Sequence, residues 1–222
     1  MPSSYYIEGF DLAKKPLTSK LFLDEGLAEV GFLEAALRLR DADVERVTIL
    51  CFQGISKMKG KSETIVKLLA PDVLVQLRAI GVMADAEQDP GARISTIIEC
   101  AKAFSFPKCA KDLSETGRHE YEGRLFAFSL SPSAKKAGRL EDLILKEVAG
   151  DAVSNCINLS LPCFEKEHQV LNEKAKVQMY ISAAMNTSMA GIRNAFAAGL
   201  FYPADAAYSH HLDMVDSILG AP

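Results

Sequence analysis

Short apolar runs alternate along the chain with segments in which apolar residues recur at helical spacing. The runs are rich in β-branched and aromatic residues and predict strands at residues 21–23, 47–52 and 79–84. The helical spacing predicts helices over residues 30–40, 65–77 (divided or offset by Pro71) and 92–104. Strand and helix in alternation favour a mostly parallel sheet covered by helices, in which functional groups gather at the carboxyl ends of the strands.

The rest of the chain follows a less regular pattern. It predicts a strand at residues 121–130, helices at 140–148, 170–185 and 205–219, and an edge strand or an arm within residues 1–20. We see no internal repeat and no disordered linker. We therefore expect an α/β domain over residues 1–150 and a helical C-terminal extension over residues 151–222 that packs on the same domain.

Composition indicates a globular protein with a sizeable core, because 49% of the 222 residues are hydrophobic and 24% are charged. The net charge of −4 argues against a strongly basic, non-specific nucleic-acid binder, although a local basic patch stays open. The five cysteines are scattered without Cys-x-x-Cys spacing, so neither a disulfide framework nor a zinc site is indicated. Signal-peptide and membrane-spanning patterns are absent, so we expect a cytoplasmic protein.

Acidic side chains follow the apolar run at residues 79–84. Asp85, Glu87 and Asp89 stand at every second position, and carboxylates this close repel one another unless a cation lies between them. The spacing therefore suggests a divalent-metal site at a strand end. Taken singly, Asp85 or Asp89 is equally well explained as a solvated helix cap before Pro90.

A second acidic turn follows the run at residues 21–23. Gly26 permits a tight turn after Glu25, and Glu29 lies one helical turn further on. Neighbouring strands would bring Glu25 and Glu29 close to Asp85, around one or two Mg²⁺ ions, since hard oxygen ligands select hard cations.

These segments resemble Toprim domains. Residues 21–33 (LFLDEGLAEVGFL) are similar to the first Toprim motif, and residues 80–89 (IGVMADAEQD) are similar to the Asp-x-Asp strand end. The resemblance extends to Gly54-x-x-Lys57 and to residues 138–145 (GRLEDLIL), which are similar to a Gly-x-x-Glu segment in nucleases of the overcoming-lysogenization-defect type. The closest likeness is to small stand-alone prokaryotic Toprim-related proteins whose function is not established.

The resemblance implies a Rossmann-like Toprim fold and magnesium-dependent cleavage of phosphodiester bonds in DNA or RNA, with Mn²⁺ as an alternative ion. Glu25 would be the general acid/base or a metal ligand, and Lys174 would stabilise developing phosphate charge. The implied metal ligands are Asp85 and Glu87, with Glu29, Asp89 and Glu141 at a second ion or the outer shell. The implied nucleic-acid backbone contacts are Gly54 and Lys57.

Two departures from the Toprim pattern bear on the reaction. Glu87 and Glu29 stand where aspartate is usual, so each position keeps its carboxylate but changes its reach. No tyrosine is placed as a topoisomerase nucleophile, and no zinc-binding segment accompanies a primase-like core. Hydrolysis is therefore favoured over strand passage or primer synthesis.

Other readings of the sequence stay open. A HAD-type phosphatase also uses a strand ending in Asp-x-Asp, but position 90 is proline where Gly-Thr is expected. A non-catalytic adaptor or regulatory subunit, acting with a partner such as an ATPase, would suit the acidic composition. The pattern leaves a homo-oligomer open and gives no role to the pair His210 and His211.

Overall fold

The computed structural model describes residues 3–6, 18–42, 47–52, 54, 58–68, 74, 76–167, 171–187 and 191–221. Within them lies a six-stranded sheet of order β1-β3-β2-β4-β6-β5. The strands are β1 (Ser3–Tyr6), β2 (Lys20–Asp24), β3 (Val47–Cys51), β4 (Ala79–Asp85), β5 (Arg118–Tyr121) and β6 (Arg124–Ser131). All neighbouring strands are parallel except β5, which pairs antiparallel with β6. The predicted mostly parallel α/β sheet is confirmed, and β1 is an edge strand.

The central strands are buried on both faces, which explains their nearly continuous apolar sequences. Every residue of β3 is buried, and so is every residue of β4 except the half-buried Asp85. Side chains alternate between the faces, so Leu21 and Leu23 join one core cluster and Phe22 joins the other. The predicted strand at residues 121–130 corresponds to β6. Its antiparallel partner β5 was not predicted, and the two strands are joined by a turn at Glu122 and Gly123, which adopt positive φ angles of 50° and 70°.

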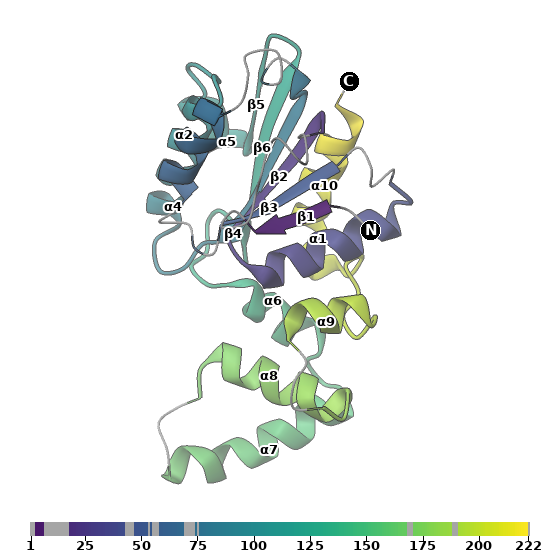
Figure 1. Cartoon of the computed structure of the whole chain (residues 1–222). Helices are drawn as coiled ribbons and strands as arrows, with labels where there is room; N and C mark the ends of the chain where they lie inside the picture. Colours follow the sequence, from purple (N-terminus) through teal and green to yellow (C-terminus); the bar gives the residue numbers. More distant parts are fainter. Residues whose placement is uncertain are drawn as a thin grey trace.

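Helices cover both faces of the sheet (Figure 1). The core cluster around Phe22 takes side chains from α1 (Leu27–Leu39), α6 (Leu140–Glu147), α8 (Glu173–Ala184), α9 (Ile192–Ala197) and α10 (Ser209–Gly220). The opposite cluster takes side chains from α2 (Met58–Leu68), α4 (Pro90–Ala103) and α5 (Ala110–Thr116). The α7 helix (Ala152–Glu167) pairs with α8 beyond α6 and α9, away from the sheet, and a 3₁₀ turn (Ala206–Tyr208) precedes α10.

The C-terminal helix returns to the middle of the sheet. Helix α10 packs against β4 and β6, and its His211 is fully buried between two serines of β6. The Nδ1 atom of His211 lies 2.5 Å from Ser129 Oγ, and its Nε2 atom lies 3.0 Å from Ser131 Oγ. This imidazole, whose pKa burial lowers, is therefore a packed core group rather than an exposed one.

The order of the strands creates a switch point between β2 and β4. The chain leaves β2 through α1 to reach β3 on one side, and later returns across β2 to reach β4 on the other side. The carboxyl ends of β2 and β4 are adjacent, since Asp24 pairs with Met83 in the register. Open α/β sheets bind ligands in the crevice at such a point.

In the described part of the chain, no helix is both long and apolar enough to cross a membrane.

Candidate functional site

A cavity of about 870 Å³ opens at the carboxyl ends of β2 and β4. Four of the predicted acids share its wall, together with the predicted Lys174 and Gly54. These acids are Glu25, Glu29, Asp85 and Glu141. They come from three separate parts of the sequence, so the fold brings together residues up to 116 positions apart, from Glu25 to Glu141.

Backbone hydrogen bonds fix the acids at the centre of the cavity. The backbone N–H of Asp85 donates to Glu25 Oε2 at 3.1 Å, and the N–H of Leu140 donates to Asp85 Oδ1 at 2.8 Å. Leu140 is the first residue of α6, so the carboxylate of Asp85 lies at the positive end of a helix. Glu87 and Gly138 exchange backbone hydrogen bonds of 2.8 and 2.7 Å, which hold the start of α6 against the end of β4.

Burial and mutual repulsion raise the pKa values of two of these acids. The pKa of Glu29 is raised chiefly by burial and further by the charges of Asp24, Glu25 and Glu141. The pKa of Asp85 is raised by burial and by Glu29, although the hydrogen bond from Leu140 opposes the rise. Without a cation, the cavity therefore favours protonated carboxyls.

Glycine allows Glu29 to approach the β2–α1 turn. A Cβ atom at Gly26 would lie 2.9 Å from Glu29 Oε2. Any larger residue at position 26 would displace this carboxylate from the turn.

Asp24 is an acid that the sequence reasoning missed. It is the last residue of β2 and is completely buried, and neither carboxylate oxygen has a hydrogen-bond partner in the described part of the structure. Burial, with a further contribution from Glu34, raises its pKa well above the usual value. The strict alternation of side chains along β2 was the available signal, because it places Asp24 on the same face as Phe22.

The donor set of the cavity fits a hard divalent cation. It consists of carboxylate oxygens held at high local negative charge, which a cation would relieve. Among the residues described, no three His, Cys, Asp or Glu side chains form a ready-made metal cage. Mg²⁺ needs no such cage, because it commonly binds through one or two carboxylates and keeps water or phosphate oxygens as its other ligands.

The far wall of the cavity is polar and comes from α8 and α9. Lys174 and Gln178 line it from α8, and Asn194 lines it from α9. Lys174 forms no ion pair with another described residue, so its charge faces the cavity uncompensated by a local salt bridge. This places a cation in the same cavity as the acids.

A close helix contact fixes that wall against the acidic side. Helix α9 lies so near α1 that a Cβ atom at Gly31 would be 2.5 Å from the Cα atom of Arg193. The guanidinium of Arg193 donates to Glu34 of α1 at 2.6 and 3.0 Å.

Two predicted metal ligands, Glu87 and Asp89, do not line the cavity. Glu87 has a positive φ of 54°, and its carboxylate accepts hydrogen bonds from Arg139 at 2.7 and 2.9 Å. Asp89 is the N-cap of α4 and accepts from the N–H of Ala92 at 3.0 Å. Both side chains are thus engaged outside the cavity lining, and Lys57 lies outside the described residues.

Comparison with known proteins identifies the family of the chain and solved structures with a similar fold. A family model described as "Protein of unknown function (DUF3226)" matches residues 19–207. The C-terminal region of the Burkholderia pseudomallei OLD protein is similar in structure, with a TM-score of 0.51 and 15% identity over 90% of this chain and 98% of that one. The C-terminal region of the Xanthomonas campestris pv. campestris OLD protein is also similar, with a TM-score of 0.50 and 15% sequence identity over 91% of this chain and 97% of that one. No curated protein matches the sequence. The structural likeness confirms the Rossmann-like fold that the Toprim resemblance predicts.

Proposed function

The chain belongs to the DUF3226 family, and we propose that it is a magnesium-dependent nuclease of the Toprim type that hydrolyses phosphodiester bonds in nucleic acid. One observation carries this proposal. Glu25, Glu29, Asp85 and Glu141 converge at the switch point of the sheet, in a cavity that also presents Lys174. Carboxylates crowded in this way, in one cavity with a cation, suit the binding of a metal ion and a phosphate together.

Each residue has a role that its surroundings support. A metal ion bound here would polarise a phosphoryl oxygen and activate water. Asp85 would hold the ion directly, since its second oxygen is oriented by the hydrogen bond that its first oxygen accepts from Leu140. Glu25 lies one hydrogen bond from the Asp85 backbone and would take up the proton of the attacking water or join Asp85 as a ligand.

The remaining groups would act around that pair. Glu29 and Glu141 would bind water of the ion or a second ion, and Lys174 would stabilise charge on the phosphate in the transition state. Gly54 would leave room for the nucleic-acid backbone at the rim. We leave Glu87 and Asp89 out of the ligand set because their side chains are engaged elsewhere.

The second candidate is an adaptor that binds metal or nucleic acid without cleaving it, together with a partner such as an ATPase. The acidic net charge of −4 favours it, because an acidic protein gains little affinity for nucleic acid from its overall charge. Glu87 favours it as well, since the carboxylate expected beside Asp85 is bound to Arg139 instead.

A cleavage assay separates the two candidates. The protein is incubated with Mg²⁺ or Mn²⁺ and a panel of supercoiled DNA, linear DNA, structured RNA and tRNA. Glu25→Gln keeps the shape of the side chain but removes its charge, and Glu115→Gln on exposed α5 is the matched control. We expect nicking or cleavage by the wild type and by Glu115→Gln, and its loss in Glu25→Gln. Metal and nucleic-acid binding without cleavage by any of the three proteins would support the adaptor instead.

A further inference from the structure

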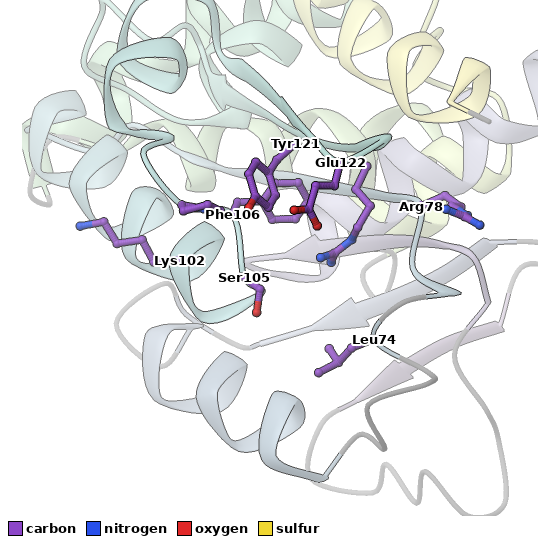
Figure 2. A pocket seen from close by; sticks show the side chains of 9 residues that line it. Leu74, Arg78, Lys102, Ser105, Phe106, Tyr121 and Glu122 are labelled. Carbon is purple, nitrogen blue, oxygen red and sulfur yellow. The ribbon is translucent and has the colours of Figure 1, made fainter.

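A second cavity, of about 630 Å³, lies at the opposite edge of the sheet, where β4 and β6 begin (Figure 2). Its charged lining residues are Arg78, Lys102, Glu122 and Arg124. The seven residues of β4 separate it from the acidic cavity, a length of roughly 20 Å at about 3.3 Å per residue. Its lining shares no residue with the acidic cavity.

Arg124 places a positive charge in the wall of this cavity, which the charge of Glu122 partly offsets. Its Nε donates to the carbonyl of Leu77 at 3.0 Å, and its second nitrogen donates to the carbonyl of Phe104 at 3.2 Å. The guanidinium carbon lies 4.7 Å from the centre of the Phe106 ring. These contacts fix the side chain in place without neutralising it, and its partial burial lowers the pKa of the guanidinium.

The other charges leave a net positive site. Arg78 is exposed and forms no ion pair with any described residue, and its proximity also lowers the pKa of Arg124. Lys102 is turned away from the labelled rings in Figure 2 and pairs with Glu99 at 2.7 Å. Glu122 is the single acid in the lining, so two guanidinium groups face one carboxylate.

The apolar part of the lining supplies a flat surface. Figure 2 shows Tyr121 and Phe106 together on one wall, with Arg78 on the other side of the cavity and Leu74 apart from them. Phe106 is buried under Arg124, whereas Tyr121 is partly exposed. A ring bound here would therefore pack against Tyr121, with Arg78 on the other side of the cavity.

We propose that this cavity binds a free nucleoside monophosphate, with the phosphate on Arg78 and Arg124 and the base against Tyr121. Guanidinium groups match the geometry of phosphate oxygens, and aromatic side chains stack on any base. The cavity volume falls in the range of small-ligand sites, which is about 300–1,000 Å³. The proposal does not depend on the nuclease function, because it concerns the other edge of the sheet.

Calorimetric titration of the protein with UMP and AMP tests whether this cavity binds a nucleoside monophosphate. EDTA is present so that no metal bridges the phosphate to the acidic cavity. We expect the wild type to bind at least one of them with a Kd below about 1 mM. Arg78→Glu should weaken that binding by about tenfold or more, whereas Lys111→Glu, an equal charge reversal on exposed α5, should leave it unchanged. Glu122→Gln should tighten it, because it removes the acid that opposes the phosphate.

Three results would overturn the proposal. The first is the absence of binding by the wild type at millimolar UMP and AMP. The second is equal affinity in the wild type and in folded Arg78→Glu, with folding checked by circular dichroism. The third is tighter binding of a 5′-phosphorylated oligonucleotide than of either mononucleotide, which would make this surface a contact for nucleic-acid strands rather than for a free ligand.

Discussion

The two ends of the parallel strands, here called the carboxyl edge and the amino edge of the sheet, carry opposite charges within one fold. The carboxyl edge gathers Glu25, Glu29, Asp85 and Glu141, whereas the amino edge gathers Arg78 and Arg124. The net charge of −4 conceals this separation. Two arginines outnumber the lining acid Glu122 at the amino edge, and like charges raise the pKa of Asp85 at the carboxyl edge, so we expect each edge to favour a ligand of the opposite sign.

The manner of burial also differs between the edges. The acids lie where β2 and β4 end and receive backbone N–H donors, which still leaves two of them with raised pKa values. Arg124 donates instead to backbone carbonyls and stays partly open to solvent. The acidic edge is therefore the more strained of the two, and its stability should depend more strongly on its ligand.

Asp85→Asn should have the largest effect of the variants considered, and it should lower the cleavage rate without changing the affinity of the amino edge for UMP. We expect the rate of magnesium-dependent cleavage to fall by about 100-fold or more, because the variant removes a charged ligand or a proton acceptor at the reacting phosphate. The affinity for UMP in EDTA should stay within about twofold of wild type, since the binding cavity lies at the other edge. Loss of both properties would show that the two cavities are not separate sites.

The pH dependence of stability should come mainly from the acidic edge. Asp24, Glu29 and Asp85 have raised pKa values in the folded protein, so the folded state keeps protons that the unfolded chain has lost above about pH 4. The metal-free protein should therefore lose stability as pH rises from about 4 to about 8, by up to about 1.4 kcal/mol per pH unit for each group.

Thermal unfolding at several pH values measures this loss. Mg²⁺ should restore stability at the upper end of the range, and Asp24→Asn should flatten the dependence, because it replaces a buried carboxyl without partners by a neutral group. Glu115→Gln is the exposed control. A metal-free protein whose stability rises over this pH range would contradict the proposed electrostatics of the acidic edge.

Gly31→Ala should disturb only the acidic edge. The added methyl group would meet the backbone of Arg193 at 2.5 Å, and backbone atoms cannot move aside as a flexible side chain can. We expect a loss of about 1–3 kcal/mol in unfolding free energy and a higher KM for nucleic acid, because this contact positions α9, whose Asn194 lines the acidic cavity. Gly60→Ala in α2, where a methyl group meets no atom within 4 Å, should be neutral or stabilising.

Asp89→Ala should have the smallest effect, and it separates a helix cap from a metal ligand. The loss of the hydrogen bond to Ala92 should cost about 1 kcal/mol of unfolding free energy. The affinity for Mg²⁺ should stay within about twofold of wild type. A tenfold weaker affinity, by isothermal calorimetry, would return Asp89 to the ligand set.

Much of the fold could be predicted from the sequence, because its central strands are short apolar runs and its helices have regular apolar spacing. The turn between β5 and β6 was missed because Glu122 and Gly123 interrupt what looks like a single strand. Helix α7 was missed because it contains Pro162 and leaves Leu159 exposed, which breaks its apolar spacing even though Val153 and Ile157 pack against the core. The order of the strands depends on contacts distant in sequence and has no local signal.

The candidate site was predictable where strand ends determine it. Glu25 follows β2 and Asp85 ends β4, and parallel neighbours bring such strand ends together. Glu87 could not be placed in the same way, because its position depends on a positive φ and on Arg139, which is 52 residues away. Asp24 ends the apolar run of β2, and the alternation of side chains along that strand, which places it on the same face as Phe22, was the signal for its burial.

The binding of Mg²⁺ by the acidic cavity is the central claim, and calorimetry at about pH 8 tests it most directly, because the carboxyls then release their protons most readily. We predict saturable binding of Mg²⁺ by the wild type and by Glu115→Gln, and binding at least about tenfold weaker in Asp85→Asn. A wild type that takes up neither Mg²⁺ nor Mn²⁺, or a folded Asp85→Asn protein that binds them equally well, would contradict it.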